Sequence, residues 1–139
     1  MNAKRFRQLV DEALETIPVE FRDAMRNIAI VVEDEPTTRQ LADVGIEPPD
    51  TLFGLYEGVP LTERAWSEGG TLPDKITLFQ RPIEDASADE DDLVIGIGET
   101  LIHEIGHYFG LSEEEIEEIE ERYWRSAGYV RDNGNDEQD

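Results

Sequence analysis

Both histidines of this chain lie in one short segment, Leu101 to Gly110, which reads LIHEIGHYFG. His103 and His107 are four residues apart, and Glu104 directly follows the first of them. On an α-helix, residues four apart lie one above the other, so both imidazole rings can reach one metal ion, and imidazole suits zinc well. A glutamate one residue along, about 100° around the axis, can reach a water molecule on that ion without being a ligand itself. The pattern predicts a zinc-binding helix with Glu104 in the position of a general base.

The alternative is that both histidines are ordinary, hydrogen-bonded residues of the core. Burying two imidazoles and a carboxylate costs free energy unless something compensates for it. A bound divalent cation compensates for that cost, so we favour one zinc ion per chain. The apolar neighbours on which this argument depends are Leu101, Ile102, Ile105 and Phe109.

A helix that carries these histidines needs a beginning, an end and an apolar face. Ser87 or Asp89 can cap its first turn, and the acids around them suit the positive end of a helix. Gly110 is a natural terminator because it adopts the left-handed conformation without a side-chain penalty. The predicted apolar stripe, which anchors the helix, consists of Leu93, Val94, Ile97, Leu101 and Ile105.

A second helix is predicted to follow directly. Ser112 and Glu115 form a capping-box pattern that opens it. Its apolar face is Ile116, Ile119, Tyr123, Trp124 and Ala127, and its remaining acids form a solvated face. Glycines in the first of these two helices indicate close packing against another backbone, namely Gly96, Gly98 and Gly106.

The first part of the chain is predicted to form the core around this helix. Apolar residues recur at helical spacing up to Pro18, which predicts an opening helix over about the first fifteen residues. Val19 to Arg26 reads as a short helix, and Ile28 to Val32 as a buried β-strand. A loop follows, with a helical turn around Leu41.

Two further strands are predicted before the histidines. Leu52 to Glu57 is a short strand, and Lys75 to Gln80 (KITLFQ) is β-branched and aromatic with near alternation. The second ends shortly before Pro82, a residue found mainly at sheet edges or strand ends, so it is a candidate edge strand. The alternative is an interior strand.

The chain is strongly acidic. Its 34 acidic and 12 basic residues, ten of them arginine, give a formal net charge of −22. We therefore expect no non-specific binding to nucleic acid or to an anionic membrane, because both are polyanions like the chain itself. One hypothesis is adaptation to high salt, which screens the self-repulsion; the other is recruitment of a basic substrate or partner.

Composition also limits which ligands a zinc site can use and indicates where in the cell the protein is located. Without cysteine, any zinc site must use nitrogen and oxygen ligands, and no disulfide can form. No apolar run approaches the length that spans a membrane, and no signal-peptide pattern opens the chain. We therefore expect a soluble, cytoplasmic protein.

The run from His103 to Glu113, HEIGHYFGLSE, resembles the extended zincin signature H-E-x-x-H-x-x-G-x-x-ligand. More of the chain is similar to the minimal zincin-like metalloproteases of bacteria and archaea. The segments FGLYEGVPLTER (Phe53 to Arg64), LPDKITLFQ (Leu72 to Gln80) and HEIGHYFGLS (His103 to Ser112) follow in the same order. No methionine follows the histidines, so the Met-turn of the larger metzincins is absent.

The resemblance implies that Glu113 is the third zinc ligand, because catalytic zinc sites hold three protein ligands and leave one position open. Close family members more often have aspartate there, so the side chain is one methylene longer in this chain. Glu114 and Glu117 are the alternative ligands. Glu113 also suits the first turn of a helix simply as a favourable charge.

The resemblance further implies peptide hydrolysis, with Glu104 as the general base that takes a proton from water. Arg64 or Tyr56 would stabilise an oxyanion or bind a substrate carboxylate, the alternatives being a structural ion pair and a core position. As an edge strand of the zincin type, Ile76 to Gln80 would pair with an extended substrate. The expected partner is a peptide or protein substrate.

These expectations combine into an α+β, minimal zincin-like fold. A small sheet of about three strands, mixed or antiparallel, packs with an N-terminal helix, the zinc helix and a C-terminal helix. Residues 1–130 form a single metalloprotease domain, and 131–139 an acidic, disordered tail. The alternative function is a non-catalytic, zinc-stabilised or inert module that binds a partner through its acidic surface. The presence of Glu104 disfavours this non-catalytic alternative, because a structural zinc site needs no general base.

Overall fold

A computed structural model describes residues 1–58 and 74–126. The elements follow in the order α1 (Ala3–Leu14), α2 (Val19–Ala24), a 3₁₀ turn (Met25–Asn27), β1 (Ile28–Glu33), α3 (Thr38–Asp43), β2 (Gly54–Glu57), β3 (Asp74–Phe79), α4 (Gln80–Asp85), α5 (Glu90–Phe109) and α6 (Glu113–Ser126). The predicted tail, residues 131–139, lies outside the described residues, so the division into domain and tail stays a prediction.

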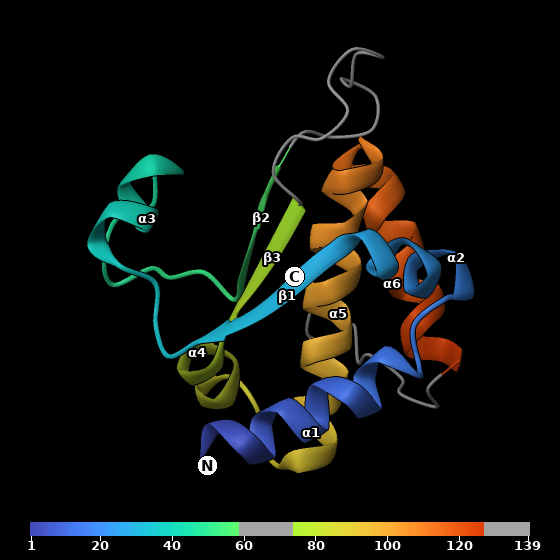
Figure 1. Cartoon of the computed structure of the whole chain (residues 1–139), viewed down its shortest axis with the longest axis horizontal. Helices are drawn as coiled ribbons and strands as arrows, with labels where there is room; N and C mark the ends of the chain where they lie inside the picture. The colour runs from blue at the N-terminus through green and yellow to red at the C-terminus, as the bar shows by residue number, and fades with distance from the viewer. Residues whose placement is uncertain (59–73, 127–139) are drawn as a thin grey trace, which may run out of the picture.

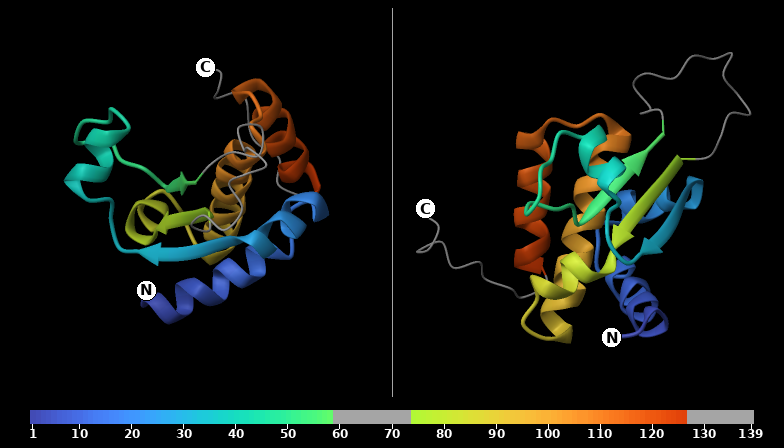
Figure 2. Two further views of the ribbon diagram at one scale, coloured as in Figure 1. Left: turned by 45° about the horizontal axis from the view of Figure 1, so that its top comes forward. Right: turned by 90° about the vertical axis from the view of Figure 1, so that its left-hand side faces the viewer.

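One small mixed sheet packs against one long helix (Figure 1). The strand order is β1-β3-β2; β3 pairs with β1 in parallel and with β2 antiparallel. Helix α5 packs against β2 and β3 on one side, against α1 near its N-terminal end and against α6 along its length (Figures 1 and 2). Helix α3 lies apart from this core, at the far end of the sheet (Figure 2). The predicted α+β fold is confirmed.

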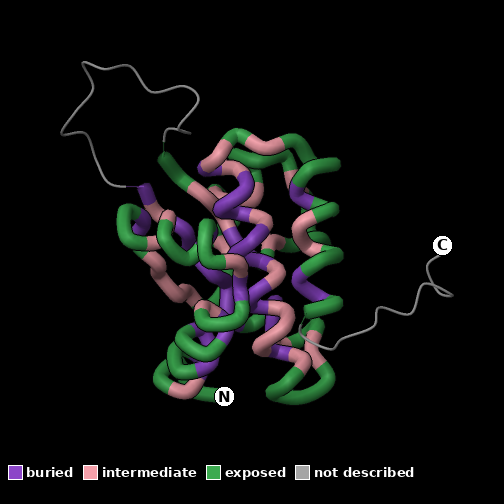
Figure 3. The backbone as a smooth tube through the Cα atoms, turned by 90° about the vertical axis from the view of Figure 1, so that its right-hand side faces the viewer, coloured by how far each residue is buried: buried purple, intermediate pink, exposed green. Residues whose placement is uncertain are grey.

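The core lies where α1, α5, α6 and the sheet meet, and burial follows α5 along most of its length (Figure 3). In α6 the buried and half-buried residues recur at helical spacing and the other residues are exposed, as expected for a helix with one apolar face. The fully buried large side chains include Phe6 and Leu9 of α1, Ile76 and Leu78 of β3, and Ile97, Leu101, Ile102 and Ile105 of α5. Within the described residues, no helix combines the length and the apolar composition needed to cross a membrane.

Local signals set the ends of α5 as predicted. Asp89 is its N-cap, and the side chain accepts a hydrogen bond from the Asp92 N–H. Gly110 ends it in the left-handed conformation, with φ of 73°. The predicted close packing at glycines holds for Gly98 and Gly106, but the groups packed against them are side chains of α6 and not backbone.

The prediction of β3 as an edge strand is wrong, because β3 lies between the other two strands. Pro82 falls in the first turn of α4 and does not mark the edge of the sheet. A missing N–H in the first turn of a helix leaves no hydrogen bond unmade.

The predicted burial of β1 is also wrong beyond Ile28. Among the described residues this strand pairs with β3 alone, and its later residues are exposed or half-buried. Helix α4 was not foreseen.

The central strand offers a test of the packing. Thr77 is fully buried, and its hydroxyl has no hydrogen-bond partner among the described residues. Thr77→Val removes an unpaired polar group at nearly constant shape, so the free energy of unfolding should rise by about 1 kcal/mol. Leu78→Ala, at an equally buried neighbour, should lower it by about 2–5 kcal/mol. Urea unfolding of both variants measures the difference; a loss of stability in Thr77→Val would show that the hydroxyl is paired.

Candidate metal centre and active site

Helix α5 and the first turn of α6 bring His103, His107 and Glu113 together. Nε2 of His103 lies 3.8 Å from Oε1 of Glu113, and Nε2 of His107 lies 3.5 Å from Oε2 of the same carboxylate. One ligand atom from each of the three residues lies within 4.8 Å of the others. Two ligands of a tetrahedral zinc ion, each bonded at about 2.0–2.2 Å, are roughly 3.4 Å apart. The three side chains therefore fit a zinc ion with small adjustments.

The turn between α5 and α6 directs Glu113 toward the histidines. The Gly110 N–H donates to the His107 carbonyl at 3.0 Å, and the Leu111 N–H donates to the Gly106 carbonyl at 2.9 Å, as in a Schellman motif. Ser112 and Glu115 then make the two reciprocal hydrogen bonds of a capping box, at 2.8 and 3.1 Å. The chain reverses at once, and the first residue of α6 faces back to α5.

Glu104 is almost fully buried between α5 and β2, with 8% of its surface exposed. Its Oε1 accepts a hydrogen bond of 2.9 Å from the Tyr56 N–H on β2. The same oxygen lies 3.8 Å from Nδ1 of His107. Burial raises the pKa of the Glu104 carboxyl, and the nearby histidines and the Tyr56 N–H oppose that shift. The carboxylate therefore lies beside the candidate metal ligands and is oriented by the backbone of the sheet.

A third acidic side chain, besides Glu104 and Glu113, belongs to this site and was not predicted. Oε2 of Glu120, on α6, lies 3.6 Å from Nδ1 of His103. At that distance the contact is an ion pair, and a small movement of either side chain would bring it into hydrogen-bond range. The Glu120 carboxylate is the main cause that raises the pKa of His103. Its signal in the sequence is its place in the apolar stripe of α6, four residues after Ile116 and four before Trp124.

A sequence model of the zincin-like metallopeptidase family matches residues 25–123, which is most of the chain. The chain belongs to this family. Among curated proteins, none matches it. The predicted family is thereby confirmed. Membership supports a hydrolase of the peptidase kind at the level of the family, and a His-His-Glu group of the described residues could hold a metal ion.

The other predicted site residues of this zincin-like metallopeptidase do not belong to the His-His-Glu group. Glu114 and Glu117, the alternative third ligands, are exposed and do not join the His-His-Glu group. The Tyr56 hydroxyl donates to Asp74 at 3.2 Å, and its ring makes an edge contact with Tyr108, so its backbone N–H is the part that contacts Glu104. Arg64 lies outside the described residues.

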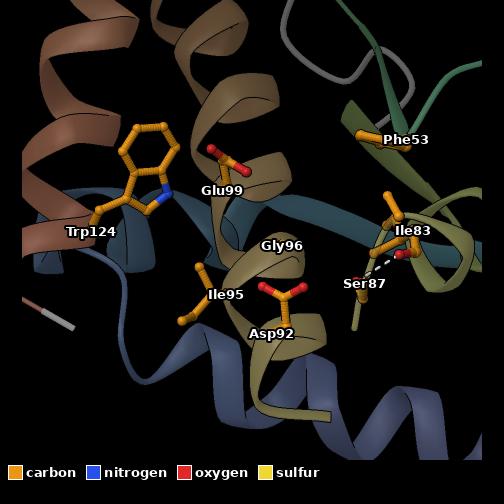
Figure 4. Close-up of a pocket in the computed structure, with 9 residues that line it drawn as sticks. Phe53, Ile83, Ser87, Asp92, Ile95, Gly96, Glu99 and Trp124 are labelled. Atoms are coloured by element: carbon orange, nitrogen blue, oxygen red, sulfur yellow. Dashed lines mark hydrogen bonds between the residues drawn. The ribbon is translucent and has the colours of Figure 1, made fainter. Parts of the chain in front are cut away.

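A cavity of about 390 Å³ adjoins the candidate site of the zincin-like domain. Residues 51–54 form one wall, which includes the half-exposed Phe53. The opposite wall belongs to α5 and α6 and carries His103, Glu104 and Glu120. A smaller cavity of about 190 Å³ lies further toward the start of α5, around Gly96 and Glu99 (Figure 4). The larger cavity is thus the one that borders the candidate catalytic groups.

The approach of β2 to α5 depends on Gly54. A Cβ atom at this position would lie 2.7 Å from Cγ2 of Thr100 and 3.2 Å from Cγ of Glu104. Any side chain there would force β2 away from the helix. Since Tyr56 on the same strand donates to Glu104, the spacing between β2 and α5 also sets the position of that carboxylate.

Two glycine-to-alanine variants test this spacing. Gly54→Ala should lower the free energy of unfolding by about 1–3 kcal/mol, because the new methyl group overpacks the contact with Thr100. Gly96→Ala is the matched control: it lies inside α5 beside the smaller cavity (Figure 4), and its Cβ would be 3.7 Å from the nearest heavy atom. Gly96→Ala should raise the free energy of unfolding by about 0.5–1 kcal/mol, because alanine has a higher helix propensity than glycine. Thermal or urea unfolding measures both, and equal stability of the two variants would contradict the proposed overpacking.

Proposed function

We propose that this chain is a zinc-dependent peptidase in which His103, His107 and Glu113 hold one zinc ion and Glu104 is the general base. The observation that carries the proposal is the convergence of both Nε2 atoms on one carboxylate, at 3.8 and 3.5 Å, beside a buried glutamate. Two nitrogens and a carboxylate form the ligand set of a catalytic zinc site with an open position.

When bound, zinc supplies Lewis acidity, which polarises a carbonyl oxygen and lowers the pKa of a water molecule to about 7. The chain's own contribution to the proton transfers is Glu104. Its Oε1 is held by the Tyr56 N–H, which leaves Oε2 to take a proton from the water that attacks the scissile carbonyl carbon. The same oxygen then gives that proton to the amine nitrogen as the C–N bond breaks.

The substrate is placed by the cavity between residues 51–54 and α5. Its 390 Å³ is enough for one side chain and the adjoining backbone, and His103 and Glu104 form part of its wall. The outer edge of β2 is partly occupied, because the Tyr56 N–H is already bonded to Glu104. The substrate is therefore proposed to use the cavity and not to extend the sheet at Tyr56.

The general base is tested by Glu104→Gln. The amide oxygen can still accept the hydrogen bond from Tyr56, so the fold and the zinc content should be unchanged, whereas the proton acceptor is lost. Cleavage of an unstructured, casein-like substrate should fall by about 10²–10⁴-fold. Elemental analysis gives the zinc content and the cleavage assay gives the rate. Full activity in this variant would remove Glu104 from the mechanism.

The third ligand is tested by Glu113→Ala, with Glu114→Ala as the matched control. Both residues are exposed acids in the first turn of α6, so both substitutions remove the same favourable charge from the helix end. Only Glu113→Ala should weaken zinc binding, and His103→Ala should abolish it. Zinc stoichiometry and affinity are measured on metal-replete protein. Equal binding by both glutamate variants would exclude Glu113 as a ligand.

Zinc content and cleavage, measured on the same metal-replete wild-type protein, also distinguish the peptidase from the non-catalytic alternative. One zinc ion per chain together with chelator-sensitive cleavage is the result expected of the peptidase. One zinc ion without cleavage of any unstructured substrate would favour an inert, zinc-stabilised module. Absence of zinc from the wild type would overturn the site itself.

A further inference from the structure

Glu120 is an acidic residue on the apolar face of α6. Its neighbours on that face, Ile116, Tyr123 and Trp124, are buried. Within α6, which is described throughout, every other glutamate is exposed. The side chain of Glu120 is 15% exposed, whereas that of Glu121 is 59% exposed. A carboxylate in such a place costs free energy unless a charged or hydrogen-bonding partner meets it.

The partner is the ring of His103. Glu120 Oε2 lies 3.6 Å from Nδ1 of this ring, and Glu113 Oε1 lies 3.8 Å from Nε2. Glu113 and Glu120 are seven residues apart, which is two helical turns, so they lie on the same face of α6. The His103 ring therefore lies between two carboxylates of one helix, with one ring nitrogen directed to each.

This arrangement excludes Glu120 as a ligand of the same ion. The lone pair of Nε2 and the N–H of Nδ1 point away from the ring in roughly opposite directions. An ion bound at Nε2, beside Glu113, lies on the far side of the ring from Glu120. What Glu120 can do is accept the Nδ1–H, which fixes the tautomer and the ring orientation that present Nε2 to a metal.

We propose that Glu120 is the positioning residue for His103, and that it tunes the zinc affinity of the site without binding the metal. The proposal rests on the proposed function, because it takes His103 as a zinc ligand. For His107, the carboxylate near Nδ1 among the described residues is Glu104, at 3.8 Å, and Glu104 is the proposed general base. Glu120 is thus a carboxylate at the site with no other role in the mechanism.

The zinc affinity of the whole 139-residue chain, measured by competition with a chromophoric chelator, tests the proposal. Glu120→Ala should weaken zinc binding by about 10–100-fold, the usual effect of removing the hydrogen-bond acceptor of a metal-bound histidine. Glu120→Gln keeps an acceptor oxygen and should restore most of that loss. The control is Glu117→Gln, which removes one charge from an exposed position of the same helix and should bind zinc as the wild type does.

A second readout separates positioning from general support of the fold. In the zinc-loaded wild type, nitrogen-15 NMR of the histidine rings should show His103 protonated at Nδ1, with slow exchange of that proton. In Glu120→Ala the proton should exchange rapidly while thermal unfolding of the metal-free protein still occurs as one cooperative transition. A variant that loses metal-free stability but keeps wild-type zinc affinity and slow exchange would overturn the proposal.

The outcomes distinguish this proposal from the proposed function. If His103→Ala loses zinc and Glu120→Ala binds it as tightly as the wild type, the positioning role fails and the zinc site stands. If Glu120→Ala loses zinc as completely as His103→Ala and Glu113→Ala keeps it, Glu120 is itself a ligand and the proposal is wrong. If the wild type binds no zinc, the proposed function is wrong, and the positioning role of Glu120, which rests on it, is wrong as well.

Discussion

The close packing of α5 against α6 is the constraint on which the site depends. The two helices are joined by a turn in which Gly110 adopts φ of 73° and the Leu111 N–H closes onto the Gly106 carbonyl. Gly106 also leaves room for Ile116, since a Cβ there would lie 2.6 Å from the isoleucine side chain. A wider separation would move Glu113 and Glu120 away from the histidines, because both project from α6 toward α5. The turn and the helix contact thus bring together side chains that α5 alone cannot supply.

Three carboxylates and two imidazoles meet at this site, and their surroundings give them different properties. Glu104 is buried and hydrogen-bonded to the backbone of β2, and burial raises its pKa. The side chain of Glu113 is 69% exposed and faces both Nε2 atoms. Glu120 is mostly buried and faces Nδ1 of His103. A carboxylate that must move a proton benefits from burial, whereas one that binds a cation needs freedom to approach it, and the proposed roles follow this division.

The residues that could be predicted from the sequence are those positioned by local structure. The spacing of His103, Glu104 and His107 depends only on the helix, and the ends of that helix depend on Asp89 and Gly110, so these predictions needed no knowledge of the sheet. Glu113 came from the resemblance to zincins, and the structure brings it within reach of both rings. Its role, like those of the histidines and Glu104, stays a prediction.

What could not be predicted depends on contacts between distant segments. The order β1-β3-β2 is a matter of which strands pair, and the alternation in Lys75 to Gln80 fits a central strand as well as an edge strand. The inward position of Glu120 is hard to recognise in the sequence, because acids are so frequent in α6 that they predict one solvated face. The hydrogen bond from Tyr56 to Glu104 joins residues 48 positions apart, and only the spacing at Gly54 makes it possible. In an acidic chain such as this one, the informative glutamates are therefore the few that lie on the inward face of a helix, where burial requires a partner.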